Sequence, residues 1–250
     1  MRIPESNHAE QWTVYLDSLA SVGELWVESA ARWGNPLLLS DTLGTRLRAK
    51  SALTGSIVLA KRIASSSPED KVGILLPTTA AGMLVGMACM MLGKTTVNLN
   101  YTATESAVLS AIEQSEVKTI YTSSRFLEKL RSKGIHFDKL ADRVNLVMLE
   151  DFSANISSLE KLWVLLQCKI LPPAILKKWY CKPRPLDETA VILFSSGSEG
   201  APKGVMLSQR NILANVKQII SILETDKNDV VMANMPLFHS IGLTATQFFP

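Results

Sequence analysis

The alternation of short β-prone runs with helix-length segments between residues 71 and 149 constrains the fold of this chain more than any other feature. Each run is followed by a stretch in which apolar residues recur at helical spacing, and this order of elements predicts a parallel sheet with right-handed crossovers. The fold class we expect is therefore α/β, with a mostly parallel sheet and flanking helices. The predicted strands are residues 71–76, 95–99, 117–122 and 144–149, and the predicted helices are residues 79–92, a helix starting at 102, and residues 124–133.

Local patterns indicate where these helices begin and end. Gly93 and Gly134 each follow a helical segment, which is typical of a residue that closes a helix in the left-handed conformation. Thr102 and Glu105 have the spacing of a capping box, in which a hydroxyl and a carboxylate accept hydrogen bonds from free amides at a helix start. This spacing predicts that the second helix begins at Thr102.

One stretch in this region also has the length of a membrane span. Residues 72–92 are almost uncharged, and about 20 apolar residues suffice to cross a bilayer. However, Pro77, Thr78 and Thr79 interrupt the stretch after a short apolar run. A buried strand followed by a buried helix explains this pattern better than a transmembrane helix does.

The composition excludes several classes of protein. Of the 250 residues, 47% are apolar and 20% are charged, so general disorder is excluded. The net charge of +3 gives no indication of nucleic-acid binding. The three cysteines form no CxxC pair and the three histidines lie far apart, so we expect neither a disulfide scaffold nor a structural zinc site. A reducing compartment without an N-terminal signal peptide predicts a cytoplasmic protein.

We divide the chain into four segments. Residues 1–35 are an N-terminal helical segment, whose Trp12, Trp26 and Trp33 we interpret as packing residues. Residues 36–150 form the first α/β sheet unit, with an additional strand at 36–40 and a helix at 48–64. Residues 151–188 are a connection or insertion without a strand, and residues 189–250 are a phosphate-loop unit.

The connecting segment has two interpretations. Its Lys177, Lys178, Trp179 and Tyr180 combine basic and aromatic side chains, which suit a membrane interface. A solvated helix end followed by a proline-rich linker explains the same residues, and we favour it over peripheral membrane contact.

The segment with the clearest chemistry follows a β-prone run at residues 190–194. It contains three glycines, several hydroxyls and one lysine, and Ser208 after it is a good N-cap for a helix. Glycines allow the backbone to approach a ligand closely, and consecutive N–H groups with a lysine can surround an anion. This composition predicts a phosphate-binding loop. Its residues are Ser195, Ser196, Gly197, Ser198, Glu199, Gly200, Ala201, Pro202, Lys203 and Gly204.

Two familiar phosphate loops do not match, and one hydrolase pattern nearly does. Neither a Walker A motif nor a GxGxxG dinucleotide fingerprint is present. The spacing Ser196-x-Ser198-x-Gly200 approaches the nucleophile elbow of serine hydrolases, and Asp226 or Asp229 and then His239 follow it in the hydrolase order. The hydrolase interpretation leaves residues 202–204 unexplained, but it remains an alternative. A non-catalytic fragment that only keeps the fold is another.

The loop resembles the AMP-binding signature of the adenylate-forming superfamily, which includes acyl-CoA synthetases, luciferases and peptide-synthetase adenylation domains. A second element of that family is similar to Met235-Pro-Leu-Phe-His239-Ser-Ile-Gly242-Leu, and the resemblance extends over residues 37–250. Glu199 stands where most of the family has threonine. Ser-Gly-Ser-Glu-Gly is similar to the synthetase part of the bacterial acyl-[acyl carrier protein] synthetase / 2-acylglycerophosphoethanolamine acyltransferase group.

The resemblance implies a reaction and a site. A fatty acid would be activated with ATP and Mg²⁺ as acyl-AMP and then transferred to a thiol, that of acyl carrier protein or, in the fatty acyl-CoA ligase alternative, of coenzyme A. Cofactor-binding residues would be those of 195–200 with Lys203 and Gly204. Residue His239 would be catalytic, beside the carboxylate. The reaction would take place in the cytoplasm, with any peripheral contact at the cytoplasmic face of the inner membrane.

Two absences limit what the resemblance implies for this chain. None of the three histidines begins the His-x4-Asp signature of glycerolipid acyltransferases, so that chemistry is expected elsewhere. The family's later Tyr-Gly-x-Thr-Glu element and late lysine do not occur before Pro250. We therefore expect the front part of a longer enzyme, which folds but is inactive alone.

Overall fold

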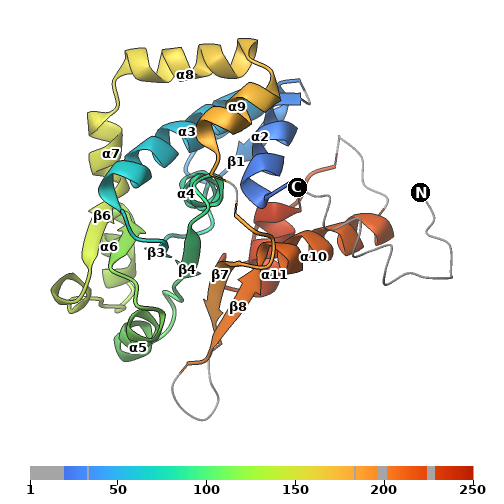
Figure 1. The fold of residues 1–250 in the computed structure, drawn as a ribbon. Helices are drawn as coiled ribbons and strands as arrows, with labels where there is room; N and C mark the ends of the chain where they lie inside the picture. The colour runs from blue at the N-terminus through green and yellow to red at the C-terminus, as the bar shows by residue number, and fades with distance from the viewer. Residues whose placement is uncertain (1–19, 33, 183, 196–201, 224–228, 250) are drawn as a thin grey trace, which may run out of the picture.

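The computed structural model describes residues 20–32, 34–182, 184–195, 202–223 and 229–249 (Figure 1). Its centre is a six-stranded sheet with the strand order β6-β5-β3-β4-β7-β8. The first five of these strands run parallel to one another, and β8 pairs with β7 in the antiparallel direction. The predicted α/β class with a mostly parallel sheet is confirmed. The strands are β3 (Lys71–Ile74), β4 (Thr95–Asn98), β5 (Thr119–Thr122), β6 (Asn145–Met148), β7 (Thr189–Phe194) and β8 (Gly204–Ser208).

Helices cover both faces of this sheet because the side chains of a strand alternate between its faces. On β3, Val72 and Ile74 pack in the cluster that includes α3 and α4. The intervening Gly73 and the following Leu75 face the side on which α5 packs through Val108 and Ile112. The helices are α2 (Val22–Arg32), α3 (Ala49–Ser66), α4 (Ala80–Met91), α5 (Glu105–Ser115), α6 (Ser124–Arg131), α7 (Leu149–Asn155), α8 (Ser158–Ile170), α9 (Pro173–Tyr180), α10 (Gln209–Ile222) and α11 (Ser240–Leu243), with a short 3-10 helix (Leu140–Asp142) and a π-helix (Thr244–Phe248).

The nearly uncharged stretch 72–92 folds as β3 and α4, both of which are buried in the protein. Thr79 is the N-cap of α4, and its hydroxyl accepts a hydrogen bond from the N–H of Gly82. Gly93 follows with a φ of 65° and closes the helix as predicted. Within the described parts of the chain, no helix combines the length and the apolar character that crossing a bilayer requires.

The predicted capping box at Thr102 and Glu105 is wrong. Thr104 caps α5 instead, with its hydroxyl accepting from the N–H of Ala107 at 3.3 Å. Thr102 donates its hydroxyl to Asn100 Oδ1 at 2.7 Å, and this bond belongs to a turn before the helix. The Glu105 carboxylate accepts from the backbone N–H of Lys139 at 2.7 Å, so it serves a tertiary contact rather than the helix start.

Two strands escaped the sequence analysis. The strand predicted at 36–40 exists as β1 (Leu37–Ser40), but it pairs with the unpredicted β2 (Arg46–Arg48) in a separate antiparallel hairpin. Strand β8 was also missed. Strand β2 has three residues and β8 has five, and both are only partly buried, so neither shows a clear alternation of apolar and polar residues. Pairing with a neighbouring strand, rather than intrinsic propensity, therefore decides their conformation.

The connection at 151–188 contains no strand among its described residues, as expected, but it is helical. Val164, Cys168 and Leu176 of α8 and α9 pack on Val27 of α2 and Leu53 of α3. Trp26 is partly buried against the same cluster, consistent with a packing role, whereas Trp12 and Trp33 lie outside the described residues. Figure 1 shows α8 and α9 as a further layer over α2 and α3, on the side away from β7 and β8.

Candidate functional site

The two ends of the predicted phosphate loop lie next to each other at the carboxyl end of β7. The backbone N–H of Ser195 donates to the carbonyl of Lys203 at 3.0 Å, which continues the pairing of Phe194 with Gly204. Ser195 and Lys203 are therefore held side by side at the base of the loop. Residues Ser196, Gly197, Ser198, Glu199 and Gly200 lie outside the described residues.

Lys203 carries the positive charge that a phosphate ligand requires. Its side chain is exposed, and no carboxylate of the described residues lies within ion-pair distance of its ammonium group. Next to it, Gln114 of α5 donates to the carbonyl of Pro202 at 3.0 Å and fixes this end of the loop. An uncompensated lysine beside the exposed Ser195, at the end of a buried strand, fits an anionic ligand.

Gly204 has a packing reason of its own. A Cβ at this position would lie 3.2 Å from Cε1 of Phe194 and 3.4 Å from Cγ2 of Ile192. The glycine therefore allows β8 to approach β7 closely. A contact between Gly204 and a ligand stays a prediction.

The sheet has a topological switch point between β3 and β4. After β3 the chain crosses on the face covered by α4 and enters β4, and after β4 it crosses on the opposite face through α5 to reach β5 on the other side of β3. In open α/β sheets, ligands bind outside the carboxyl ends of the strands at such a point.

The second predicted motif is anchored at this switch point. Thr78, which follows β3, donates its hydroxyl to the carbonyl of Met235 at 3.0 Å. Asn98, the last residue of β4, donates its amide to the carbonyl of Leu237 at 2.9 Å, and both residues are buried. The segment that carries His239 is thus tied to the carboxyl ends of both strands. Asn98 pairs with Leu193 in β7, so this motif and the loop base share one edge of the sheet.

Aromatic packing completes the attachment of this segment. Phe238 is buried, and its ring centroid lies 4.8 Å from that of Tyr101 in an edge-to-face arrangement. The His239 side chain is exposed, and its ring centroid lies 4.6 Å from that of Phe238. The buried phenylalanine therefore fixes the backbone while the imidazole faces outward, where it can reach a ligand.

Gly242 permits the turn after His239. A Cβ at Gly242 would lie 2.1 Å from the carbonyl oxygen of Pro236, a distance that real atoms do not reach. The first turn of α11 can fold back on Pro236 only because residue 242 has no side chain.

A carboxylate stabilises the neighbouring start of α4. Asp41 Oδ2, in the β1–β2 turn, accepts from the N–H of Ala80 at 3.1 Å, and Oδ1 accepts from the N–H groups of Leu43 and Thr45. Burial raises the pKa of Asp41, but these hydrogen bonds outweigh it and hold the pKa below the ordinary value.

Sequence reasoning missed four residues that hold the site together through contacts with residues far away in the chain. These are Thr78, Asn98, Tyr101 and Gln114. A polar residue at the end of a buried strand, as Asn98 is in β4, was the signal available in the sequence.

For the hydrolase alternative, His239 and Asp229 are described but Ser198 and Asp226 are not, so the triad stays a hypothesis. The described residues hold no cluster of three or more His, Cys, Asp or Glu that could bind a metal ion.

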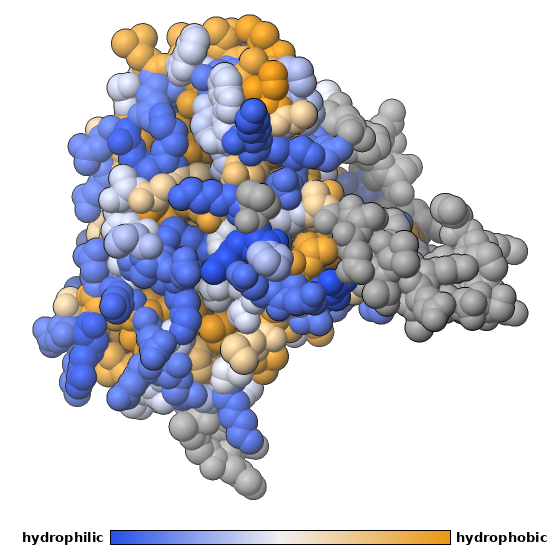
Figure 2. All heavy atoms as spheres, in the orientation of Figure 1, coloured by the Kyte–Doolittle hydropathy of each residue, from blue (hydrophilic) through white to orange (hydrophobic). Residues whose placement is uncertain are grey.

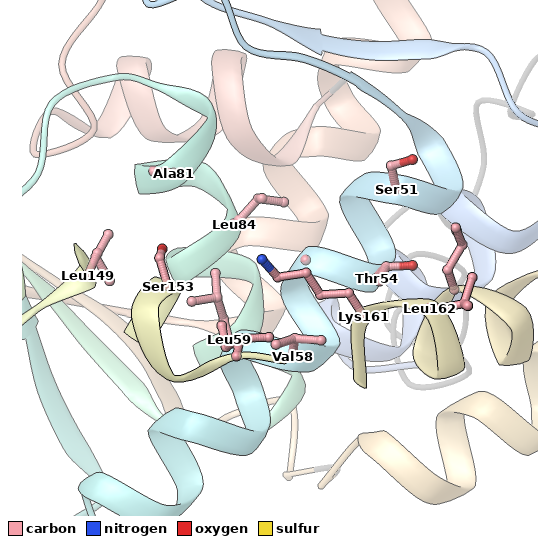
Figure 3. A pocket seen from close by; sticks show the side chains of 13 residues that line it. Ser51, Thr54, Val58, Leu59, Ala81, Leu84, Leu149, Ser153, Lys161 and Leu162 are labelled. Carbon is pink, nitrogen blue, oxygen red and sulfur yellow. The ribbon is translucent and has the colours of Figure 1, made fainter. Parts of the chain in front are cut away.

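A groove of about 530 Å³ lies away from this site, between α3, α4, α7 and α8 (Figure 3). Its walls are mostly apolar and include Val58, Leu84 and Leu162, and the Lys161 side chain extends into the space between Leu84 and Leu59 in this view. Of the predicted phosphate-binding residues that the structure describes, which are Ser195, Lys203 and Gly204, none lines this groove.

The chain belongs to the AMP-binding enzyme family, which matches residues 58–250. Among curated relatives, it is 26% identical over 231 residues to the medium-chain fatty-acid–CoA ligase of Escherichia coli (strain K12), covering 89% of this chain and 39% of the ligase. It is also 26% identical over 191 residues to long chain acyl-CoA synthetase 8 of Arabidopsis thaliana, covering 71% of this chain and 25% of the synthetase. The chain therefore spans between a quarter and two fifths of the length of these relatives.

Solved structures of similar fold include VinN, with a TM-score of 0.71 and 16% identity over 92% of this chain and 57% of VinN. The O-succinylbenzoate coenzyme A synthetase of Bacillus subtilis, in complex with ATP and magnesium ion, superposes with a TM-score of 0.66 and 21% identity, covering 90% of this chain and 53% of the synthetase. At such identities the likeness concerns the fold alone.

Proposed function

We propose that this chain contributes to an acyl-adenylate-forming ligase that activates a fatty acid with ATP. The observation that carries the proposal is the shared sheet edge. Lys203 at the base of the loop and the anchored His239 segment lie together at the carboxyl ends of β4 and β7, in a chain of the AMP-binding enzyme family. The fatty-acid ligases among its relatives support a carboxylic acid as the second substrate.

In the proposed reaction a fatty acid carboxylate oxygen attacks the α-phosphorus of ATP, and pyrophosphate leaves. Lys203 and the hydroxyls of Ser195, Ser196 and Ser198 hold the β- and γ-phosphates, with the backbone of Gly197, Glu199, Gly200 and Gly204 close to them. Mg²⁺, when bound, neutralises phosphate charge. Positioning and charge neutralisation account for the catalysis, since the protein makes no covalent bond in this step.

In the second step a thiol sulfur attacks the acyl carbon, and AMP leaves. His239 lies beside the carboxylate in this proposal, where its exposed imidazole can orient the acid. We propose the phosphopantetheine thiol of acyl carrier protein as acceptor, on the basis of Glu199 in the loop. The coenzyme A ligases among the relatives support the alternative acceptor. Three free cysteines support a reducing, cytoplasmic location.

The test is exchange of labelled pyrophosphate into ATP by the full-length protein, with and without a fatty acid. We expect exchange that depends on the acid and that falls in Lys203→Ala, because a hydrogen bond to a charged group contributes about 1.5–3 kcal/mol. Lys118→Ala, which removes an exposed lysine at the amino end of β5, is the matched control. Exchange without any dependence on a carboxylic acid would contradict the proposal.

The acceptor needs a separate measurement. Acyl-AMP formed in place is mixed with holo-acyl carrier protein or with coenzyme A, and the thioester is quantified. We expect the carrier protein to be acylated faster. Acylation of coenzyme A alone would leave the adenylation step intact and identify the chain as part of a fatty acyl-CoA ligase.

A further inference from the structure

Helix α8 presents its apolar side to the outside of the protein. Leu159, Leu162 and Trp163 are 79%, 62% and 61% exposed, whereas Val164 and Cys168 on the inner side are 1% exposed. A helix on the surface of a globular protein normally shows the opposite arrangement, with polar residues outward. The outward residues of α8 are Leu159, Leu162, Trp163, Leu166 and Ile170, and we call them the α8 stripe.

The next helix also exposes apolar side chains, and the α8 stripe borders the groove beside it. Ile175 and Trp179, one turn apart on α9, are also exposed. Leu162 lines the groove between α3, α4, α7 and α8, so the apolar surface extends inward from the stripe. Figure 2 shows hydrophobic residues gathered at the end of the molecule where Figure 1 places α8. Large apolar side chains that gather on an exposed surface in this way mark an interaction site.

The charges in the segment that carries the α8 stripe are mostly positive. Residues 157–182 contain five lysines and one acidic residue, Glu160. Glu160 is neutralised by Lys61 Nζ at 2.7 Å and by Arg62 Nη2 at 2.5 Å. Lys169 and Lys178 are exposed and, by helical spacing, lie at the margins of the two apolar stripes. Of the five, Lys177 pairs with Glu28.

We propose that the α8–α9 face binds the surface of an anionic lipid membrane. An apolar stripe with tryptophan at its centre and lysine at its margins is the arrangement that enters the boundary between headgroups and acyl chains. The negative charge of the lipid headgroups complements the unpaired lysines. A second copy of this chain has the same positive charges, so self-association through this face brings like charges together. Membrane binding through α8 is independent of adenylation and requires no substrate.

The binding experiment uses vesicles of equimolar phosphatidylcholine and phosphatidylglycerol, with pure phosphatidylcholine vesicles for comparison. The full chain is expected to sediment with the anionic vesicles. Each lysine near such a surface contributes on the order of fivefold, so Lys169→Gln/Lys178→Gln should lower the partition coefficient on the order of 25-fold. Lys129→Gln/Lys133→Gln, which removes two exposed lysines near α6, is the matched control and should bind as the unmodified chain does.

A second measurement localises the contact. Lipids with brominated acyl chains quench tryptophans that enter the membrane, and we expect quenching in the full chain. Trp163→Phe/Trp179→Phe keeps an apolar face, so it should still bind while the quenched fraction is lost. Quenching that is unchanged in this variant would overturn the proposal, as would equal binding of the charge variant and its control. Self-association without vesicles that Leu162→Gln/Trp163→Gln abolishes would also overturn it, and would identify a dimer interface.

Discussion

Replacement of Asn98 by leucine tests whether the switch point of the sheet holds the His239 segment. The Asn98 amide donates to the carbonyl of Leu237 at 2.9 Å, and both residues are buried. Leucine is similar in size but offers no donor, so Asn98→Leu leaves the Leu237 carbonyl without this partner. The variant thus removes one of the two side-chain hydrogen bonds described above between the motif and the strand ends, and Thr78 donates the other.

The magnitude follows from the burial of the acceptor. A buried carbonyl that loses its donor costs about 1–3 kcal/mol in the free energy of unfolding. Asn98 Oδ1 is buried and has no hydrogen-bond partner in the structure, so its removal offsets part of this cost. We therefore expect a loss of about 1–2 kcal/mol, which for a chain of this size lowers Tm by about 2–8 °C.

Urea titration gives the free energy of unfolding of the Asn98→Leu variant, and the KM of the full-length protein for the fatty acid reports on the site. Both are compared with Asn145→Leu, a control at the exposed start of β6. We expect a lower midpoint and a higher KM in the Asn98 variant and neither change in the control. Equal unfolding free energies in the two variants would show that the Asn98 bond does not hold the motif.

Four further outcomes are expected. Gly242→Ala should lower the unfolding free energy by about 1–3 kcal/mol in a urea titration, because its Cβ would lie 2.1 Å from the Pro236 carbonyl; an unchanged midpoint would mean that α11 moves freely. A fluorophosphonate probe should not label Ser198, and stoichiometric labelling that Ser198→Ala abolishes would establish the hydrolase alternative. Asp41→Asn should lower the free energy of unfolding near pH 7 but not below the folded-state pKa of Asp41, which is lowered from 3.8. A carboxyl group with a depressed pKa stabilises the fold only while it is ionised. A difference in unfolding free energy between the variant and the unmodified chain that persists in acid would argue against this linkage. Burial raises the pKa of the Cys89 thiol to about 12, so iodoacetamide should alkylate it only in urea, as peptide mass analysis can show.

The central sheet could be predicted because its strands are buried on both faces. Residues such as Val97, Ile120 and Val191 are fully buried, and the sequence shows this as short apolar runs separated by helical spacing and glycines. The glycines and serines with Lys203 after β7 likewise predict a phosphate-binding loop from chemistry alone, and this stays a prediction because residues 196–201 lie outside the described residues. Both signals are local in sequence.

The attachment of the His239 segment could not be predicted, because it depends on contacts between residues far apart. Asn98 and Leu237 are 139 positions apart, and Thr78 and Met235 are 157 apart. Only the pairing of β3 with β4 brings the two donors to the same edge of the sheet. For the same reason β8 was missed, since its conformation comes from pairing with β7 rather than from its own residues.

Helix α8 shows a different limit of sequence reasoning. Its apolar residues at positions 159, 162, 163, 166 and 170 have the spacing of a helix face that packs on a core. The structure turns this face outward and buries the smaller Val164 and Cys168 against α3 instead. Periodicity identifies an apolar helix face but does not say whether the protein core or an external partner covers it. In α8 the core contacts the side that carries Val164 and Cys168, and the α8 stripe is left exposed beside lysines. An anionic bilayer is a partner that accepts both apolar side chains and positive charge.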